Sequence, residues 1–569
     1  MKMKLLTNSG ENIECEDVFY KAVEFLKEGK IIAVKGLGGF HLACDAENGY
    51  AVECLRRRKK RPNKPLAIMA KNLDLIKSIS YVSNAEEKAI INKKAPIVLL
   101  RKNANYNLPK CVAPDMKRVG IMLPYTDIHY NLFDEDLNFL VMTSGNISSA
   151  PIQYKDLEAL NALSNIADYF ILHDNPIEIP LEDSVVKFYE EREIIVRGGR
   201  GYAPSKRKID IEKVIVALGG EQKSTFAISK DGYAYLSQYF GDLKYIGAFE
   251  AYESELKKYM HQCKLKPEIV AFDLHPSFIT SQYAAKMEGI KLPIQHHHAH
   301  MVSCMVEHSI YDNVLGVIFD GTGFGTDDQV WGGEFFVGNI DSFIRVGHFR
   351  YVSIQGGDLS IKEPWRIAVS YLYSLGYEAE KYIKDLDFNK TDIVIQALKN
   401  NLNCYKSSSV GRLFDCVSSL LGLCHYITYD AEGAILLENI IDEDEEGSYA
   451  YRIHNNNGCF QIDNREILDD LLSDIMDGVS KSTISARFHN TLIKITVDTV
   501  IIISKLYGLN KVVLSGGCFE NTYLLGNVLE RLREEGFITY YNQQIPTNDS
   551  GISIGQLAIA NRLGSVRPG

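Results

Sequence analysis

Apolar and polar positions alternate over residues 17–205 in a pattern that predicts short strands followed by amphipathic helices. Apolar runs at 31–34, 66–69, 141–142 and 194–196 are typical of buried strands, and each leads into a glycine-rich or polar turn. Because strands that alternate with helices build layered sheets, this part of the chain is predicted to be an α/β domain.

A second set of strands begins after a charged stretch at 205–210, which is the best linker candidate. Apolar runs at 214–218, 268–272, 314–319 and 511–514 have the same strand-like character, and Asp231-Gly232 predicts a hairpin. We therefore expect one α/β domain at 1–206, a linker at 207–213 and another α/β domain at 214–569. The closing residues 564–569 have no apolar pattern and are expected to form a tail.

Composition narrows the function classes. A length of 569 residues is too great for one core, and a net charge of −11 argues against a surface built for nucleic acid. No apolar run is long enough for a membrane span, and the N-terminus lacks the apolar core of a secretory signal. Eleven cysteines without a C-x-x-C pair suit a reducing compartment. We expect a cytoplasmic protein with no membrane association.

A basic run at 56–64 places seven cations in nine residues before Pro65. Such runs are usually solvated faces, and they also occur in nucleic-acid patches or localisation signals. Pro62 and Pro65 restrict the backbone, and a strand follows, so the context favours a rigid anion site. Polar turns at 143–146, 183–184 and 197–204 lie beside other strands and could gather at one concave site, although each is also compatible with an ordinary turn.

Together these segments resemble the YrdC-like family, which binds ATP and forms acyl-adenylates of carbamate-type groups. The resemblance covers roughly residues 17–205 and rests on four motifs that occur in order. It implies a site in which cationic side chains hold phosphate or the carbonyl-bearing group and other side chains complete the nucleotide site. The implied residues are Lys59, Arg61, Lys64, Ser144, Asn146, Ser184 and Arg197.

The stretch His296-His297-His298-Ala299-His300 precedes an apolar pattern with helical spacing. On a helix His296 and His300 share one face, so both imidazoles come within reach of one metal ion. A solvated histidine patch is the alternative. Asp320 ends a strand before Gly321-Thr322-Gly323, where a carboxylate is well placed to hold a metal beside phosphates. Asp549 precedes a predicted helix, where a helix cap is the simpler interpretation.

This second half, about residues 213–562, resembles the branch of actin/hexokinase-type nucleotide-binding domains that transfers carbamoyl or threonylcarbamoyl groups. The resemblance implies His296, His300, Asp320 and Asp549 as metal ligands, and a choice between iron(II) and zinc stays open on ligand chemistry. It implies a nucleotide held by Gly321, Thr322, Gly516, Gly517 and Asn521, with Asp415 in a loop at the ribose.

The order of the two halves resembles the HypF family of hydrogenase maturation carbamoyltransferases. The resemblance implies ATP and Mg²⁺ as cofactors beside the bound transition metal, and carbamoyl phosphate or carbamate as donor. Lys59, Arg61, Lys64, His296 and His300 are then the expected catalytic residues. The carbamoyl group would pass through carbamoyl-adenylate to the C-terminal cysteine thiol of a HypE-type acceptor protein, on the route to the cyanide ligand of the nickel-iron centre.

Three other functions stay open at this point. A small-molecule O-carbamoyltransferase has similar parts but is expected in the reverse order, and the net charge weighs against a tRNA threonylcarbamoylation enzyme. A nucleotide-binding assembly scaffold without chemistry is the third. Family members also begin with an acylphosphatase-like domain and zinc-finger modules that this sequence lacks. We therefore expect a truncated or short member that uses carbamoyl phosphate poorly by itself.

Overall fold

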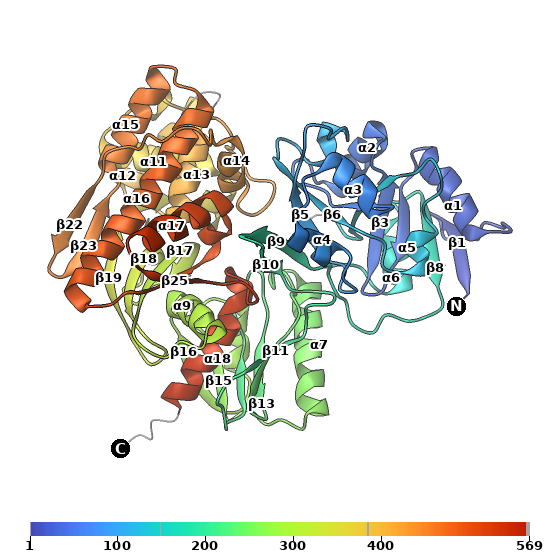
Figure 1. The fold of residues 1–569 in the computed structure, drawn as a ribbon, viewed down its shortest axis with the longest axis horizontal. Helices are drawn as coiled ribbons and strands as arrows, with labels where there is room; N and C mark the ends of the chain where they lie inside the picture. Colours follow the sequence, from blue (N-terminus) through green and yellow to red (C-terminus); the bar gives the residue numbers. More distant parts are fainter. Residues whose placement is uncertain (1, 148–149, 384–385, 565–569) are drawn as a thin grey trace. The chain divides into compact units, whose positions relative to one another are not determined.

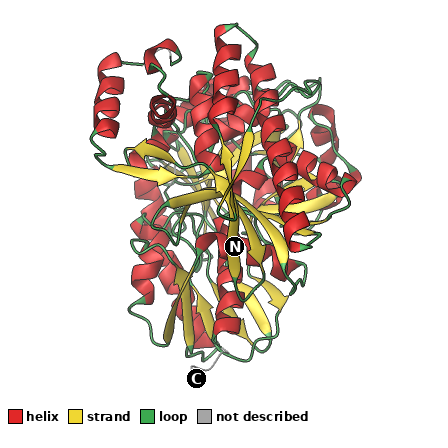
Figure 2. Cartoon of the chain, turned by 90° about the vertical axis from the view of Figure 1, so that its left-hand side faces the viewer, coloured by secondary structure: helices red, strands yellow, loops and turns green. Residues whose placement is uncertain are grey.

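The computed structural model describes residues 2–147, 150–383 and 386–564, so the predicted tail lies outside the described residues except for Gly564. The chain forms two compact units. The N-terminal unit comprises Met1–Lys206, Glu221–Thr225 and Tyr235–Lys266, and the C-terminal unit comprises Arg207–Gly220, Phe226–Ala234 and Pro267–Gly569. Both units mix helices and strands (Figures 1 and 2). The α/β class is confirmed, and the predicted domain limits stay a prediction.

A mixed sheet with ten strands in the described residues forms the N-terminal unit. Its order is β1 (Met3–Thr7), β8 (Tyr169–His173), β2 (Ile32–Lys35), β3 (Phe40–Asp45), β7 (Phe139–Ser144), β4 (Ile68–Ala70), β6 (Arg118–Met122), β5 (Ile97–Arg101), β9 (Val185–Tyr189) and β10 (Arg192–Arg197). The pairs β2–β8, β4–β6 and β5–β9 are parallel. The strands predicted from apolar runs are therefore present and lie in one sheet.

The helices of this unit are α1 (Val18–Lys27), α2 (Gly49–Lys59), α3 (Leu73–Ile79), α4 (Asn84–Ile90), η1 (Lys110–Val112), α5 (Asp127–Tyr130), α6 (Asp156–Leu163) and α7 (Ile246–Gln262). Leu26 of α1 packs with Ile32, Val34, Leu140 and Ile171 of the sheet in a fully buried core. Helix α2 ends where Lys60 adopts a left-handed conformation, with φ 53° and ψ 48°. The basic run therefore continues from a helix into a sharply turned loop.

Two sheets form the centre of the C-terminal unit, counted over the described residues. One has the order β11 (Ser205–Lys208), β14 (Tyr233–Leu236), β13 (Ala227–Lys230), β12 (Ile215–Ala217), β15 (Ile269–Asp273) and β16 (Ile290–Ile294). The other has the order β22 (Arg452–Asn456), β23 (Cys459–Asp463), β19 (Phe343–Phe349), β18 (Val330–Gly338), β17 (Val314–Phe324), β24 (Lys511–Ser515) and β25 (Ile538–Tyr541), with β20 (Val352–Gln355) and β21 (Cys404–Ser407) alongside.

The helices of this unit are α8 (Ile279–Ala284), α9 (His296–Glu307), α10 (Asp358–Lys362), α11 (Pro364–Leu375), η2 (Ala379–Lys381), α12 (Phe388–Lys399), α13 (Val410–Leu420), α14 (Glu432–Ile440), α15 (Arg465–Met476), α16 (Lys481–Tyr507), η3 (Gly517–Glu520), α17 (Thr522–Glu534), η4 (Asp549–Gly551) and α18 (Ile552–Leu563). Helix α9 packs on β17 and β24, and α18 packs on β12 and β15. The two helices also pack on each other, so they join the two sheets (Figure 1).

Close packing of α9 and α18 depends on Gly555. A Cβ atom at this position would lie 2.0 Å from the carbonyl oxygen of Ala299. Because only glycine lacks that atom, the backbones of the two helices can approach here. This contact brings the N-terminal ends of α9 and α18 into the same region.

Three local predictions are wrong. Residues 207 and 208, the start of the predicted linker, belong to β11, whose alternate residues are half-buried; the charged pattern is that of an edge strand, which lysines protect from further pairing. Residues 321–324 continue β17 after a register shift instead of forming a turn. The predicted loop around Asp415 is helix α13. Among the described residues, no helix combines the length and apolar character needed to span a bilayer.

Candidate metal centre and nucleotide-binding residues

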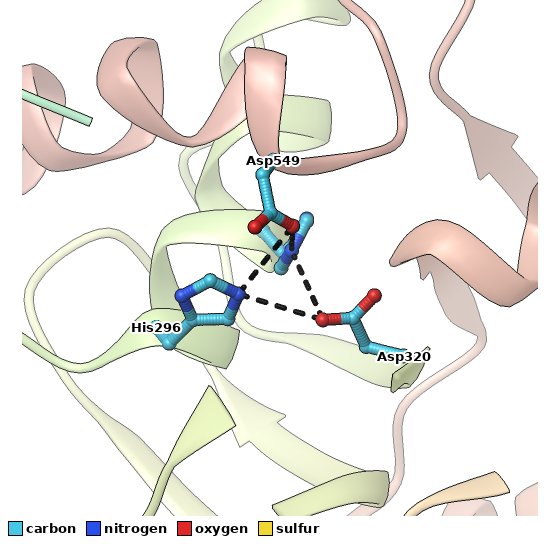
Figure 3. A group of neighbouring side chains, drawn as sticks. His296, Asp320 and Asp549 are labelled. Carbon is cyan, nitrogen blue, oxygen red and sulfur yellow. Dashed lines mark ion pairs between the residues drawn. The ribbon is translucent and has the colours of Figure 1, made fainter. Parts of the chain in front are cut away.

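Four side chains from three parts of the C-terminal unit converge on one point. His296 and His300 lie one turn apart on α9, Asp320 lies in β17, and Asp549 opens η4 in front of α18. Their four potential ligand atoms all lie within 4.8 Å of one another. Figure 3 shows the carboxylates of Asp320 and Asp549 turned toward the imidazole of His296. The structure thus brings together the four residues predicted as metal ligands.

The separations in this cluster are those expected around a metal ion. His296 Nε2 lies 3.5 Å from Asp320 Oδ2 and 3.7 Å from Asp549 Oδ1. His300 Nε2 lies 3.8 Å and 3.6 Å from the same two oxygens. Metal bonds of about 2.1 Å hold tetrahedral ligands roughly 3.4 Å apart. Both Nε2 atoms are buried without a hydrogen-bond partner among the described residues, so the cluster fits a bound divalent cation.

Asp273 orients one of these ligands and was not predicted as a site residue. Its Oδ2 lies 2.6 Å from His296 Nδ1, and both side chains are buried. Its Oδ1 accepts a hydrogen bond from the backbone N–H of His275 at 2.8 Å. A carboxylate at Nδ1 places the ring proton there and directs the Nε2 lone pair at the cluster. The sequence contains one signal for this residue: strand β15 ends in Asp273, which pairs with Ile294 at the end of β16, two residues before α9 begins.

The cluster favours positive charge. Burial opposes the charged form of His296, but Asp273, Asp320 and Asp549 raise its pKa well above the ordinary value. Burial also opposes ionisation of Asp320, but the nearby imidazoles of His296 and His300 lower its pKa to about 2. The pKa of Asp549 is lowered against burial by the same two imidazoles. Carboxylates that remain ionised in a buried site suit a cation that the histidines share with them.

The two glycine-rich segments predicted to hold a nucleotide, at 321–323 and 516–517, lie beside the cluster. The N–H of Gly517 donates to Asp320 Oδ1 at 2.9 Å. Gly516 adopts φ 100°, and a Cβ atom there would lie 2.3 Å from the carbonyl oxygen of Phe319. Gly321 is partly exposed and Thr322 is exposed, so both remain accessible next to Asp320. A nucleotide phosphate could approach this backbone closely, and the assignment stays a prediction.

Asn521 lies at the start of α17, where the contacts are made within the chain. Glu438 of α14 accepts from the N–H of Thr522 at 2.7 Å. Asn521 caps the helix by accepting from Leu524 N–H at 2.9 Å, and its amide nitrogen lies 2.9 Å from His489 Nε2. Asn521 as a nucleotide ligand therefore stays a prediction without support from its contacts.

In the N-terminal unit, Lys59 joins two predicted motifs. Its buried ammonium donates to the carbonyl oxygens of Ser144 and Asn146 and to Asn146 Oδ1, at 2.5 to 2.6 Å. Burial and the neighbouring Arg61 cation hold the Lys59 pKa well below its ordinary value. Arg61 reaches Thr143 Oγ1 at 3.3 Å in the same turn. Lys59 therefore fixes the turn that contains Ser144 and Asn146, while Arg61 and Lys64 lie in the loop beyond α2.

Arg56 organises that loop and was not singled out in the sequence. Its guanidinium is buried and donates to the carbonyl oxygens of Arg61, Pro62 and Lys64 as well as Cys111 and Val112. Arginine suits this role because its five N–H groups spread in one plane. The part of the run 56–64 that follows α2 is thus a loop braced by Arg56, as its prolines suggested, while Arg57, Lys60 and Lys64 are exposed.

Ser184 and Arg197 meet at the edge of the same sheet. Ser184 Oγ accepts from Gly199 N–H at 2.8 Å and donates to the Arg200 carbonyl oxygen at 2.9 Å. Arg197 donates to the Asp183 carbonyl oxygen at 2.9 Å. Both residues therefore stabilise the segment around Asp183, and their contact with a nucleotide stays a prediction.

Asp183 is the centre of a buried network that sequence reasoning missed. Its carboxylate lies 3.0 Å from His41 Nε2 and 3.0 Å from Arg200 Nε. The guanidinium of Arg200 also stacks on Tyr125, with its central carbon 3.5 Å from the ring centroid. Against the effect of burial, His41 and Arg200 hold the pKa of Asp183 below its ordinary value. This network joins the glycine-rich turn before His41 to β9.

Family profiles match three consecutive parts of the chain. Residues 24–199 match a profile described as "Telomere recombination", which groups Sua5, YciO and YrdC. Residues 210–307 match "HypF Kae1-like domain", and residues 316–556 match "Carbamoyltransferase, Kae1-like Domain, second subdomain". These matches confirm the predicted fold, a YrdC-like domain followed by an actin/hexokinase-type carbamoyltransferase domain.

Curated relatives and solved structures are similar to nearly the whole of this chain. Carbamoyltransferase HypF of Synechocystis is 36% identical over 96% of this chain and 73% of its own length, and the probable carbamoyltransferase HypF of Methanocaldococcus jannaschii is 32% identical over 97% and 73%. The crystal structure of full-length HypF in the phosphate- and nucleotide-bound form matches with 39% identity and a TM-score of 0.94, over 100% of this chain and 74% of that one. The T. kodakarensis HypF structure matches with 30% identity and a TM-score of 0.91, over 99% and 76%. The chain therefore belongs to the HypF carbamoyltransferase family.

Proposed function

We propose that this carbamoyltransferase activates a carbamoyl group with ATP and transfers it to the C-terminal cysteine thiol of a HypE-type acceptor during nickel-iron hydrogenase maturation. Carbamoyl phosphate or carbamate is the donor, and carbamoyl-adenylate is the intermediate. The observation that carries the proposal is the convergence of His296, His300, Asp320 and Asp549 beside accessible glycine backbone. The acceptor thiol must stay reduced, so we place the reaction in the cytoplasm, where the chain's own unpaired cysteines are also expected.

The first half-reaction belongs to the N-terminal unit. Carbamate is supplied directly or by hydrolysis of carbamoyl phosphate, which releases inorganic phosphate. A carbamate oxygen attacks the α-phosphorus of ATP, a new P–O bond forms, and pyrophosphate leaves with the electron pair of the broken bond. Arg61 and Lys64 offset the charge of the phosphates together with Mg²⁺. Lys59 holds the turn of Ser144 and Asn146 in place through its three hydrogen bonds.

The second half-reaction belongs to the C-terminal unit. The acceptor thiolate attacks the carbonyl carbon of the mixed anhydride, and AMP leaves. A metal held by His296, His300, Asp320 and Asp549 would supply Lewis-acid polarisation of an oxygen atom in this site. Asp273 keeps the Nε2 lone pair of His296 directed at the cluster. Iron(II) and zinc suit this donor set equally well.

The test is mass spectrometry of a HypE-type acceptor after incubation with the chain, ATP, Mg²⁺ and either carbamate or carbamoyl phosphate. We expect the terminal cysteine to gain one carbamoyl group, and to gain it faster with carbamate than with carbamoyl phosphate. Modification of small hydroxylated acceptors or tRNA without modification of the thiol would move the function to one of the alternative transferases. No modification of any acceptor, with nucleotide and acceptor still bound, would indicate a scaffold.

A double substitution separates the metal cluster from folding. His296→Ala with His300→Ala is expected to abolish transfer and metal binding while the acceptor still binds. The control is His308→Gln at the C-cap of the same helix, where His308 Nε2 lies 2.8 Å from the Tyr541 carbonyl oxygen. Transfer at the wild-type rate by the double variant would exclude a role of the cluster in the reaction.

A further inference from the structure

We propose that Arg412 is an anion-binding residue of the C-terminal unit and binds a phosphate oxygen of the nucleotide beside Gly321. The chemical class of the ligand is a nucleoside monophosphate or an acyl-adenylate, both of which carry a charged phosphate next to the ribose. The inference deepens the proposed function, on which it rests for the identity of the nucleotide. It stands on the position and the hydrogen-bond state of the Arg412 side chain.

The guanidinium of Arg412 is buried and under-satisfied. The side chain is 8% exposed, and neither Nε nor Nη1 has a hydrogen-bond acceptor among the described residues. These two nitrogens carry three N–H donors. In native proteins nearly all buried N–H donors are hydrogen-bonded. A buried guanidinium with three unpaired donors therefore indicates a ligand that supplies the acceptors.

Asp415 satisfies Arg412 only in part. Its Oδ2 lies 2.9 Å from Arg412 Nη2, one turn along α13. The same oxygen has no aligned hydrogen bond, so the contact is a close ion pair with poor directionality. Burial raises the pKa of Asp415 to about 6 even though Arg412 lowers it. The pair therefore leaves most of the donor capacity of Arg412 unused.

The position of Arg412 points to the ligand. Ser409 is the N-cap of α13. Its Oγ lies 2.7 Å from the carbonyl oxygen of Asp320 and 2.6 Å from that of Gly321, so its single proton is donated to one or shared between them, and the same Oγ accepts from Arg412 N–H at 3.1 Å. A Cβ atom at Gly321 would lie 3.6 Å from Arg412 Nη2. Ser409 thus ties the backbone of Arg412 to the strand that carries the metal ligand Asp320 and the accessible Gly321.

Phosphate fits this position better than a structural role alone. Arginine forms charge-assisted hydrogen bonds with phosphate oxygens and stays charged when buried. The Gly516–Gly517 turn, whose Gly517 N–H donates to Asp320 Oδ1, offers a further backbone segment that a ligand can approach closely. A helix held only by packing would gain nothing from a buried guanidinium with open donors.

Binding of AMP and of adenosine to the full chain tests the inference, because the two ligands differ only by the phosphate. Isothermal titration is carried out with wild type, Arg412→Lys and Arg412→Met. We expect AMP to bind about 10 to 100 times more weakly at the C-terminal site of both variants, with adenosine affinity unchanged. Arg61→Ala is the matched control for the N-terminal site and leaves the C-terminal component of the titration as it is in wild type.

Asp415→Asn separates anion binding from the ion pair. If Arg412 served only to pair with Asp415, this variant and Arg412→Lys would change AMP and adenosine binding alike. We expect Asp415→Asn to preserve the ratio of the two affinities and Arg412→Lys to lower it. Equal AMP affinity in wild type and both Arg412 variants, with circular dichroism showing folded protein, would overturn the inference.

The half-reactions distinguish this inference from the proposed function. Pyrophosphate exchange into ATP reports the N-terminal unit, and we expect Arg412→Lys to leave its rate unchanged while transfer to the acceptor slows at least tenfold. If wild type shows neither exchange nor transfer, the proposed function fails, and the AMP-to-adenosine ratio still decides the role of Arg412. If transfer by Arg412→Lys equals wild type, the role of Arg412 in the reaction is refuted while the function stands.

Discussion

The substitution Asp273→Asn tests how the C-terminal unit prepares His296 for a metal. Asp273 uses both carboxylate oxygens, one for the backbone N–H of His275 at 2.8 Å and one for His296 Nδ1 at 2.6 Å. Asparagine offers one oxygen and one NH₂ group, so it cannot accept at both positions. If its oxygen stays with His275, the NH₂ group donates to His296 Nδ1 and the ring proton moves to Nε2. The metal-facing nitrogen then carries a proton and cannot bind the ion.

The magnitude follows from the burial of this pair. Both side chains are buried, with Asp273 at 0% and His296 at 1% exposure, so water cannot replace the lost acceptor. Loss of a carboxylate that orients a histidine ligand weakens metal binding about 10- to 100-fold. This corresponds to about 1.4 to 2.7 kcal/mol of binding free energy. If the asparagine turned over to keep His296, it would lose His275 instead, so one hydrogen bond is lost in either orientation.

The assay is competition for Zn²⁺ or Co²⁺ between the full chain and a chromophoric chelator. Asp312→Asn serves as the control. Asp312 is exposed and pairs with Lys511, so this substitution removes the same charge as Asp273→Asn, but from the surface. We expect wild-type metal affinity in the control and weaker binding in Asp273→Asn, with both variants folded by circular dichroism. Metal affinity equal to wild type in Asp273→Asn would refute the reasoning about the tautomer.

Three further predictions concern the N-terminal unit. Arg56→Lys leaves several carbonyl oxygens of the braced loop unpaired, so we expect urea unfolding to show a loss of about 2 to 4 kcal/mol, and wild-type stability would contradict this. Lys59→Met leaves the three acceptor oxygens of Ser144 and Asn146 without their donor, so we expect pyrophosphate exchange to slow at least tenfold. An unchanged exchange rate would contradict this prediction. His41 and Arg200 keep the pKa of Asp183 below its unfolded value of about 3.9, so its stabilisation is complete above about pH 4 and is lost as the pH falls further. Acid unfolding compared between wild type and Asp183→Asn checks this, because the variant should lose that slope.

The sequence supported most of the metal centre for definite reasons. Helical spacing places His296 and His300 on one face without any knowledge of tertiary structure, and Asp320 follows an apolar run that is typical of a buried strand. Asp549 came from family resemblance, since its local pattern also fits a helix cap. Its place in the cluster depends on the packing of α18 against α9, which no local pattern encodes. The family and the α/β class were likewise predicted, and both are confirmed.

Residues that act through tertiary contacts escaped prediction. Arg56 looks like its neighbours Arg57 and Arg58 in the sequence, and only the turn after α2 brings the carbonyl oxygens of the loop to it. Asp273 could have been suspected because β15 and β16 are parallel, so the end of β15 lies beside the start of α9. The family resemblance implied a loop around Asp415, but Ser409 is the cap of a helix that contains this residue.

The two halves differ in how their polar groups are satisfied, and this difference bears on when each site is assembled. Lys59 and Arg56 place their donors on backbone carbonyl oxygens of the chain, so the loop beyond α2 is braced before any substrate arrives. In the C-terminal unit, by contrast, the Nε2 atoms of His296 and His300 and most of the Arg412 donors have no partner among the described residues. Buried polar groups of this kind are stable only when something completes them. The loop beyond α2 is therefore pre-formed by the chain, whereas the C-terminal site would be completed by the metal and nucleotide that we propose for it.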